Sequence, residues 1–130
     1  MELRTRIALR CLSTGYLVLL TVLLLTPDPM AVFRPERELY GIVSWLMPSA
    51  HFLTMALLAW LTLAARWPLP LGWIFGLLVL YAVGTEGLQS LVPTRTPSLA
   101  DVFQNLIGIA TGSAVWVLPA LLIRRSIAAE

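Results

Sequence analysis

Four long apolar runs dominate the sequence and determine what it can fold into. They occupy residues 7–26, 49–65, 71–91 and 100–123, with prolines or arginines between them. A helix of about 20 mostly apolar residues spans the hydrocarbon layer of a membrane. The second run is the shortest and reaches that length by including residues before it. The sequence therefore predicts an all-α fold: one integral membrane domain over residues 1–130, built as a four-helix bundle.

The charge content supports this class and excludes several others. Only 12% of the residues are charged and 58% are hydrophobic, whereas a soluble domain has about a quarter charged residues. This composition excludes a soluble domain and also a disordered chain. The net charge of +2 comes without a clustered basic stripe, so no nucleic-acid partner is expected. The single cysteine, Cys11, excludes an internal disulfide.

The arginines indicate how the chain crosses the membrane, because short cytoplasmic loops carry an excess of basic residues. All nine basic residues are arginines. With the N-terminus inside, Arg34, Arg37 and Arg95 lie outside and the other six lie on the cytoplasmic side. We therefore expect both termini to be cytoplasmic, in a bacterial inner membrane.

The first run and the connection after it each carry a further signal. The basic start of the run also resembles a secretory signal peptide. It lacks a small-x-small cleavage site, so an uncleaved helix is expected. In the connection, Pro35 and Glu36 are typical of a helix start, and apolar residues follow. This pattern predicts a short external interfacial helix between the first two spans.

Ionisable residues inside a span are costly unless they are paired or face water, so each is a candidate functional residue. Here they gather where the third and fourth runs meet. Glu86 and Gln89 share a helix face near the end of the third run. Asp101 and Asn105 lie one turn apart at the start of the fourth. His51 lies in the first turn of the second helix, which enters from the same side, so we expect these side chains to converge near the outer leaflet.

The residue types at this junction suit proton transfer and anion binding. Glu86, His51 and Asp101 are the candidate catalytic residues, acting as general acid or base. Arg95 is the candidate ligand for an anionic headgroup or carboxylate, which a guanidinium binds through two parallel hydrogen bonds. The sequence does not decide whether chemistry occurs, so whether the protein is an enzyme is left open. If chemistry occurs, Glu86 would act as the general acid or base, with His51 or Asp101 as its partner.

Each of these residues also has a purely structural interpretation. Asp101 or Ser98 could cap the fourth helix. Arg95 could extend to lipid headgroups at the membrane surface. Gln89 and Asn105 are the candidate ligand-binding amides, and they could equally hold helices together. Glu86 is the hardest to explain structurally, because it precedes the helix end by several residues and has no basic partner within four positions.

Two further patterns concern packing and metals. Gly108 and Gly112 continue the helix stripe that contains Asp101 and Asn105, and their spacing indicates a close helix contact. No metal and no other cofactor is expected, because His51 is the only histidine and zinc sites usually have more than one. A divalent ion held by His51 and the two carboxylates is left open as an alternative.

The order and spacing of these residues are similar to the signature of a known family. The VanZ-like family of small bacterial membrane proteins has a pattern that resembles the run Glu86, Gln89, Arg95, Ser98, Asp101, Asn105, Gly108 and Gly112. His51-Phe52 resembles the family's other short motif. The resemblance covers residues 51–112, about half of the chain. An Asp-Lys pair usual before the histidine is replaced by Met47-Pro48, and an aromatic residue after it by Met55.

The resemblance implies a link to low-level resistance to glycopeptide antibiotics of the teicoplanin type, or to a broader role in the cell envelope. It implies no established reaction. The expected partners are membrane lipids and a lipid-linked envelope precursor or a glycopeptide. A non-catalytic accessory protein that binds lipid or precursor is the main alternative. A small transporter is less favoured because four helices form too small a pathway and no inverted repeat is evident, although a homo-oligomer would reopen that alternative.

Overall fold

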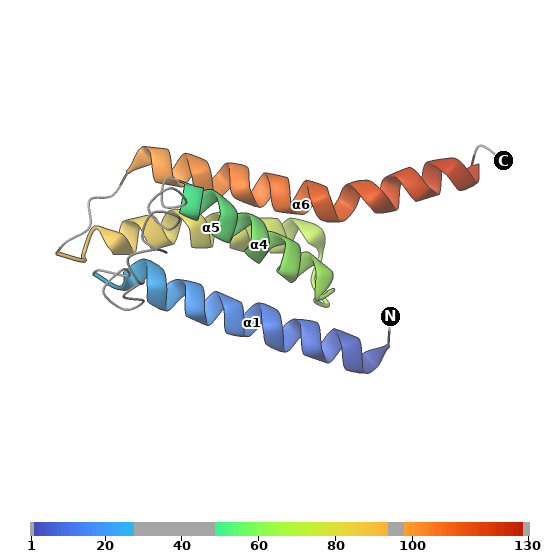
Figure 1. Cartoon of the computed structure of the whole chain (residues 1–130), viewed down its shortest axis with the longest axis horizontal. Coiled ribbons are helices and arrows are strands. Elements are labelled where there is room, and N and C mark those ends of the chain that lie inside the picture. The colour runs from blue at the N-terminus through green and yellow to red at the C-terminus, as the bar shows by residue number, and fades with distance from the viewer. Residues whose placement is uncertain (1, 28–48, 94–97, 129–130) are drawn as a thin grey trace, which may run out of the picture.

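The computed structural model describes residues 2–27, 49–93 and 98–128, with side chains as far as residue 119. Within these residues the chain forms helices and no strand. The four helices, in chain order, are α1 (Leu3–Leu25), α4 (Ala50–Ala64), α5 (Leu71–Gln89) and α6 (Leu99–Ala128). Successive helices run in opposite directions, so α1 begins and α6 ends at the same end of the bundle (Figure 1). The all-α four-helix prediction is confirmed.

Three of the helices are long and apolar enough to cross a membrane: α1, α5 and the part of α6 from Leu99 to Pro119. The fourth, α4, has only 15 residues and is apolar. Large apolar side chains such as Trp73, Leu80 and Phe103 are exposed, whereas Glu86 and Asn105 are buried. An apolar exterior with polar groups inside is the arrangement that a lipid environment favours, because unsatisfied polar groups are costly in hydrocarbon.

Two helices extend beyond the predicted limits. The sequence predicts that the first helix starts at residue 7 and the last ends at residue 123, yet α1 begins at Leu3 and α6 continues to Ala128. Both extensions contain arginines, which are good helix formers but end an apolar run. Hydropathy therefore marks the membrane-spanning part of each helix and misses its polar extension. Pro119 lies inside α6, which bends part-way along its length (Figure 1), as proline-containing helices do.

Helix α4 occupies the centre of the bundle and packs most closely against α6. Met55, Leu58 and Ala59 of α4 are almost fully buried. A Cβ atom built on Gly112 would overlap the backbone of Ala56, because it would lie only 2.9 Å from the Ala56 Cα atom. A Cβ atom on Gly108 would overlap the carbonyl oxygen of Phe52. The two glycines therefore allow the backbones of α4 and α6 to touch, as small residues do between membrane helices.

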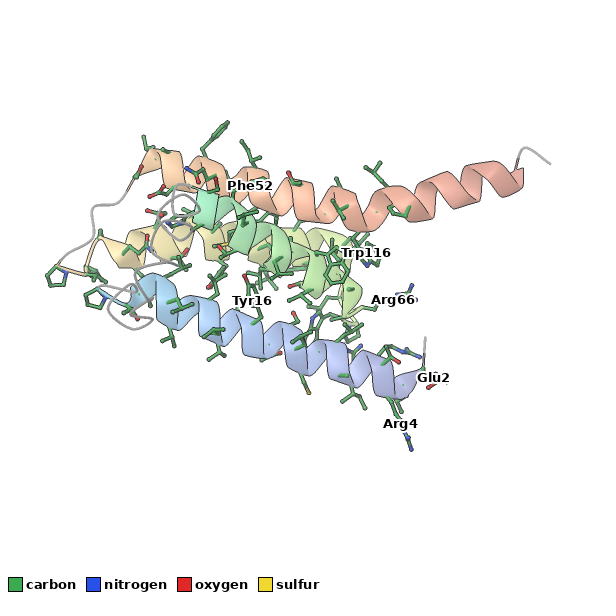
Figure 2. The ribbon with its side chains drawn as sticks, viewed as in Figure 1. Glu2, Arg4, Tyr16, Phe52, Arg66 and Trp116 are labelled. Carbon is green, nitrogen blue, oxygen red and sulfur yellow. The ribbon has the colours of Figure 1, made fainter. Side chains whose placement is uncertain are left out.

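Helix α1 is attached through both apolar and polar contacts. Only Ser13, Leu20 and Leu24 of this helix are buried. The Tyr16 hydroxyl donates to the carbonyl oxygen of Thr54 at 3.1 Å, and Figure 2 shows Tyr16 pointing from α1 into the bundle. The hydroxyl oxygens of Ser13 and Thr62 lie 3.3 Å apart. Hydrogen bonds between helices replace the hydrophobic driving force that is missing between helices in lipid.

At the end of the bundle where α1 begins, one arginine connects α1 to the end of α4. The Arg10 guanidinium donates to the carbonyl oxygens of Ala65, at 3.4 Å, and Arg66, at 2.8 Å. It also lies over the Trp67 ring, 5.4 Å from the ring centroid. Arg66 has a positive φ of 47°, a left-handed conformation that often ends a helix. A cation at the carbonyl end of α4 is favoured by the helix dipole.

The external interfacial helix that the sequence predicts lies within residues 28–48, outside the described residues. So do Arg34 and Arg37. The side of a membrane that each end of the bundle faces stays a prediction.

Candidate functional site

Four polar side chains come together at the end of the bundle opposite Arg10. We call them the polar cluster: His51, Glu86, Asp101 and Asn105. His51 lies in the first turn of α4, Glu86 in the last turn of α5, and Asp101 and Asn105 in the first two turns of α6. These three helix ends lie on the same side of the bundle (Figure 1), because α5 and α6 are consecutive antiparallel helices and α4 starts where α1 ends.

His51 lies between the two carboxylates. Its Nδ1 atom is 4.0 Å from Glu86 Oε1, and its Nε2 atom is 3.9 Å from Asp101 Oδ2. Both distances exceed hydrogen-bond length. Nδ1 is also 3.2 Å from Asn105 Oδ1, so the imidazole forms one hydrogen bond and faces a carboxylate on each side.

Burial differs strongly across the polar cluster. Asn105 is 1% exposed and Glu86 is 4% exposed. The side chains of His51 and Asp101 are 16% and 31% exposed. The polar cluster therefore has a closed side at Glu86 and Asn105 and an accessible side at Asp101.

Two buried polar atoms of the polar cluster have no hydrogen-bond partner among the described residues: Glu86 Oε1 and Asn105 Nδ2. The other carboxylate oxygen of Glu86, Oε2, accepts a hydrogen bond from the backbone N–H of Ser98 at 3.3 Å. Buried polar atoms in proteins are nearly always paired, and an unpaired one costs free energy. The hydrogen bonding of the polar cluster is therefore incomplete within the described part of the chain.

Ser98, rather than Asp101, caps α6. The Ser98 hydroxyl oxygen accepts a hydrogen bond from the Ala100 N–H at 3.2 Å, which is the geometry of an N-cap side chain. Because Ser98 supplies the cap, Asp101 is not needed for it, and its carboxylate faces His51 instead.

The remaining candidate residues lie elsewhere or outside the described chain. The Gln89 side-chain nitrogen donates to the Leu24 carbonyl oxygen at 2.8 Å, so this amide connects α5 to α1. Arg95 lies in residues 94–97, outside the described residues. Gln104, which is not among the candidate residues predicted from the sequence, has a buried Oε1 atom without a hydrogen-bond partner among the described residues. Its position beside Asp101 and Asn105 in the same polar stretch was the available signal.

Comparison with known proteins places the chain in a family. The VanZ/LLP1 family model matches residues 14–123, which include the whole polar cluster and both glycines of the α4–α6 contact. No match was found among curated proteins or among solved structures. Because the matched segment covers most of the chain, the protein belongs to the VanZ/LLP1 family.

Proposed function

We propose that the protein works in the bacterial cell envelope, in the cytoplasmic membrane, with the polar cluster at the outer face as its working site. The observation that carries this proposal is the buried Glu86 Oε1 atom, which has no hydrogen-bond partner among the described residues. Buried polar atoms in proteins are nearly always paired, so an unpaired carboxylate oxygen favours a ligand at this site. Family membership and the three membrane-length helices support the envelope setting.

The distribution of arginines supports the outward orientation. Arg4, Arg6 and Arg10 lie at the beginning of α1, and Arg66 follows the end of α4; Figure 2 shows Arg4 and Arg66 at the same end of the bundle. The end of α6, with two more arginines, lies there too. An excess of arginine marks the cytoplasmic end of a membrane protein, so the opposite end, with the polar cluster, faces outward.

The proposed ligand is a lipid-linked envelope precursor or a membrane lipid at the outer leaflet. Asp101 and His51 form the accessible side of the polar cluster. Arg95, three residues before Ser98 on the α5–α6 connection, would hold an anionic group of the ligand. Glu86 and His51 would transfer a proton if the reaction requires one. Such a site would link the protein to glycopeptide susceptibility of the teicoplanin type, because those antibiotics act on envelope precursors outside the membrane.

A susceptibility assay tests this proposal. The protein and its Glu86→Gln variant are expressed in a teicoplanin-sensitive bacterium, with Glu2→Gln as the matched control because Glu2 is an exposed acid at the other end of the bundle. We expect the wild type and the control to change the inhibitory concentration and Glu86→Gln to leave it at the vector level. Full function of Glu86→Gln at equal membrane abundance would rule out a catalytic role for this carboxylate.

A non-catalytic accessory role is the second candidate, and one contact favours it. Glu86 Oε2 already accepts a hydrogen bond from the Ser98 N–H, which places this carboxylate in a fixed connection between α5 and α6. In that case Asp101→Asn would lower thermal stability and leave the susceptibility phenotype unchanged. If the site is catalytic, Asp101→Asn would instead abolish the susceptibility phenotype and leave thermal stability unchanged. Measuring both the phenotype and the thermal stability of this variant therefore distinguishes the two roles.

A further inference from the structure

We infer that His51, Glu86 and Asp101 bind a divalent cation. One ring nitrogen of His51 and one carboxylate oxygen of each acid all lie within 4.8 Å of one another. Ligands on opposite sides of a small divalent cation lie about 4.2 Å apart and neighbouring ligands about 3 Å apart, since each metal–ligand bond is about 2.1 Å long. Modest side-chain rotations therefore bring all three ligands onto one ion.

An independent observation at Glu86 points to a ligand in this place. Glu86 is 4% exposed, and its Oε1 atom, 4.0 Å from His51 Nδ1, has no hydrogen-bond partner among the described residues. Desolvating a carboxylate oxygen without a partner costs several kcal/mol. A cation beside Oε1 supplies the missing partner.

Asn105 holds the imidazole in an orientation that suits metal binding. In the tautomer in which His51 Nδ1 donates to Asn105 Oδ1, at 3.2 Å, the lone pair is on Nε2. That lone pair then faces Asp101 Oδ2 across 3.9 Å, and two electron-rich atoms face each other with no hydrogen between them. In this tautomer a cation between the two atoms would offset their repulsion, whereas in the other tautomer the Nε2–H would point toward the carboxylate. Metal-binding histidines usually donate their other ring N–H to an oxygen acceptor in this way.

The ligand types indicate which ions fit. Imidazole suits zinc and other transition metals, and carboxylates suit manganese and magnesium. One imidazole with two carboxylates therefore fits Mn²⁺ or Zn²⁺ better than Ca²⁺, which takes six to eight oxygen ligands. Three protein ligands leave coordination positions open toward the accessible side at Asp101.

A manganese titration tests this inference. The full chain is purified in detergent, treated with a chelator and titrated with Mn²⁺, and the loss of the free-ion signal is followed by electron paramagnetic resonance. We expect one bound Mn²⁺ per chain, displaced by Zn²⁺. Glu86→Gln and Asp101→Asn are each expected to weaken binding at least tenfold, and Asn105→Ala about 10–100-fold through the orientation of the imidazole. Glu2→Gln, far from the polar cluster, is expected to bind as the wild type does.

Two results would overturn the inference. One is the absence of Mn²⁺ and Zn²⁺ binding by the folded wild-type chain at millimolar concentrations. The other is wild-type affinity in Asp101→Asn, a partly exposed position where substitution leaves the helices intact, as circular dichroism would verify. Because the titration contains no envelope lipid and no antibiotic, its outcome is independent of the susceptibility assay, and either proposal can fail without the other.

Discussion

The two ends of the helix bundle hold polar groups in opposite ways. At one end, the Arg10 guanidinium donates to two carbonyl oxygens at the end of α4 and lies over the Trp67 ring. Arg10 donates hydrogen bonds to carbonyl groups that would otherwise be left unpaired at the end of the helix. The contacts are structural and account for the position of Arg10 without any ligand.

In the polar cluster at the other end, some buried polar atoms lack hydrogen-bond partners among the described residues. His51 lies about 4 Å from each of two carboxylates, and Glu86 Oε1 and Asn105 Nδ2 have no hydrogen-bond partners among the described residues. Costly arrangements persist where function requires them. A polar residue in a membrane protein is therefore a candidate for function when its contacts leave part of it unpaired, and a structural residue when its contacts satisfy it.

The largest expected effect in this comparison is on function. Replacing His51 by Gln removes the ring that contacts Asn105 and faces both acids. If the polar cluster transfers a proton, as proposed, loss of general acid–base catalysis costs about 10²–10⁴-fold and the susceptibility phenotype should disappear. Arg10→Gln serves as the control from the opposite end and should keep the phenotype at equal membrane abundance. Equal losses in the two variants would mean that the ends do not differ in role.

The next effect concerns the glycine contact that positions the polar cluster. Gly112→Ala places a Cβ against the backbone of Ala56, and overpacking of this kind costs about 1–3 kcal/mol. Thermal unfolding in detergent would measure the loss. Gly84→Ala is the matched control, because nothing lies within 4 Å of a Cβ at Gly84. A melting temperature for Gly112→Ala equal to that of the control would show that α4 and α6 are not in backbone contact there.

A smaller effect is expected at the arginine end. Arg10→Ala removes two hydrogen bonds and the contact with Trp67. Because the bond to Arg66 is exposed, we expect the free energy of unfolding to fall by only about 1 kcal/mol. Mn²⁺ affinity should be unchanged, since Arg10 is remote from the polar cluster. Weaker Mn²⁺ binding in this variant would contradict the separation of the two ends.

An effect of similar size is expected at the cap of α6. Ser98→Ala removes the hydroxyl that accepts from the Ala100 N–H, which costs about 0.5–2 kcal/mol. The backbone N–H that donates to Glu86 remains in this variant. Chemical unfolding should show the loss, while the susceptibility phenotype is retained. A lost phenotype would mean that the hydroxyl itself takes part in the site.

The sequence predicts much of the fold because hydropathy decides where membrane helices form. The four apolar runs correspond to α1, α4, α5 and α6, and the errors are at the ends. Leu3 and Ala128 extend two helices beyond their apolar runs, since arginines continue a helix while ending its hydropathy. The predicted interfacial helix falls on residues outside the described chain.

The candidate site is only partly readable from the sequence. Helical spacing and antiparallel order suggest that Glu86, Asp101 and Asn105 approach one another, because each lies near an end of neighbouring helices. The partner of Gln89 is a backbone carbonyl of α1, and the Ser98 N–H bond to Glu86 also involves backbone. Every residue carries the same backbone groups, so the sequence does not indicate which of them a side chain will contact.

The most direct test of the central claim is the melting temperature of the chelator-treated Glu86→Gln variant against that of the wild type. Glutamine has the same shape and keeps an oxygen for the Ser98 N–H, but it removes a buried charge without a hydrogen-bonded partner at Oε1. If Glu86 is held in place for a ligand, the variant should melt at the same temperature as the metal-free wild type or above it. A clear drop in the melting temperature would show that the carboxylate stabilises the fold and would contradict the account.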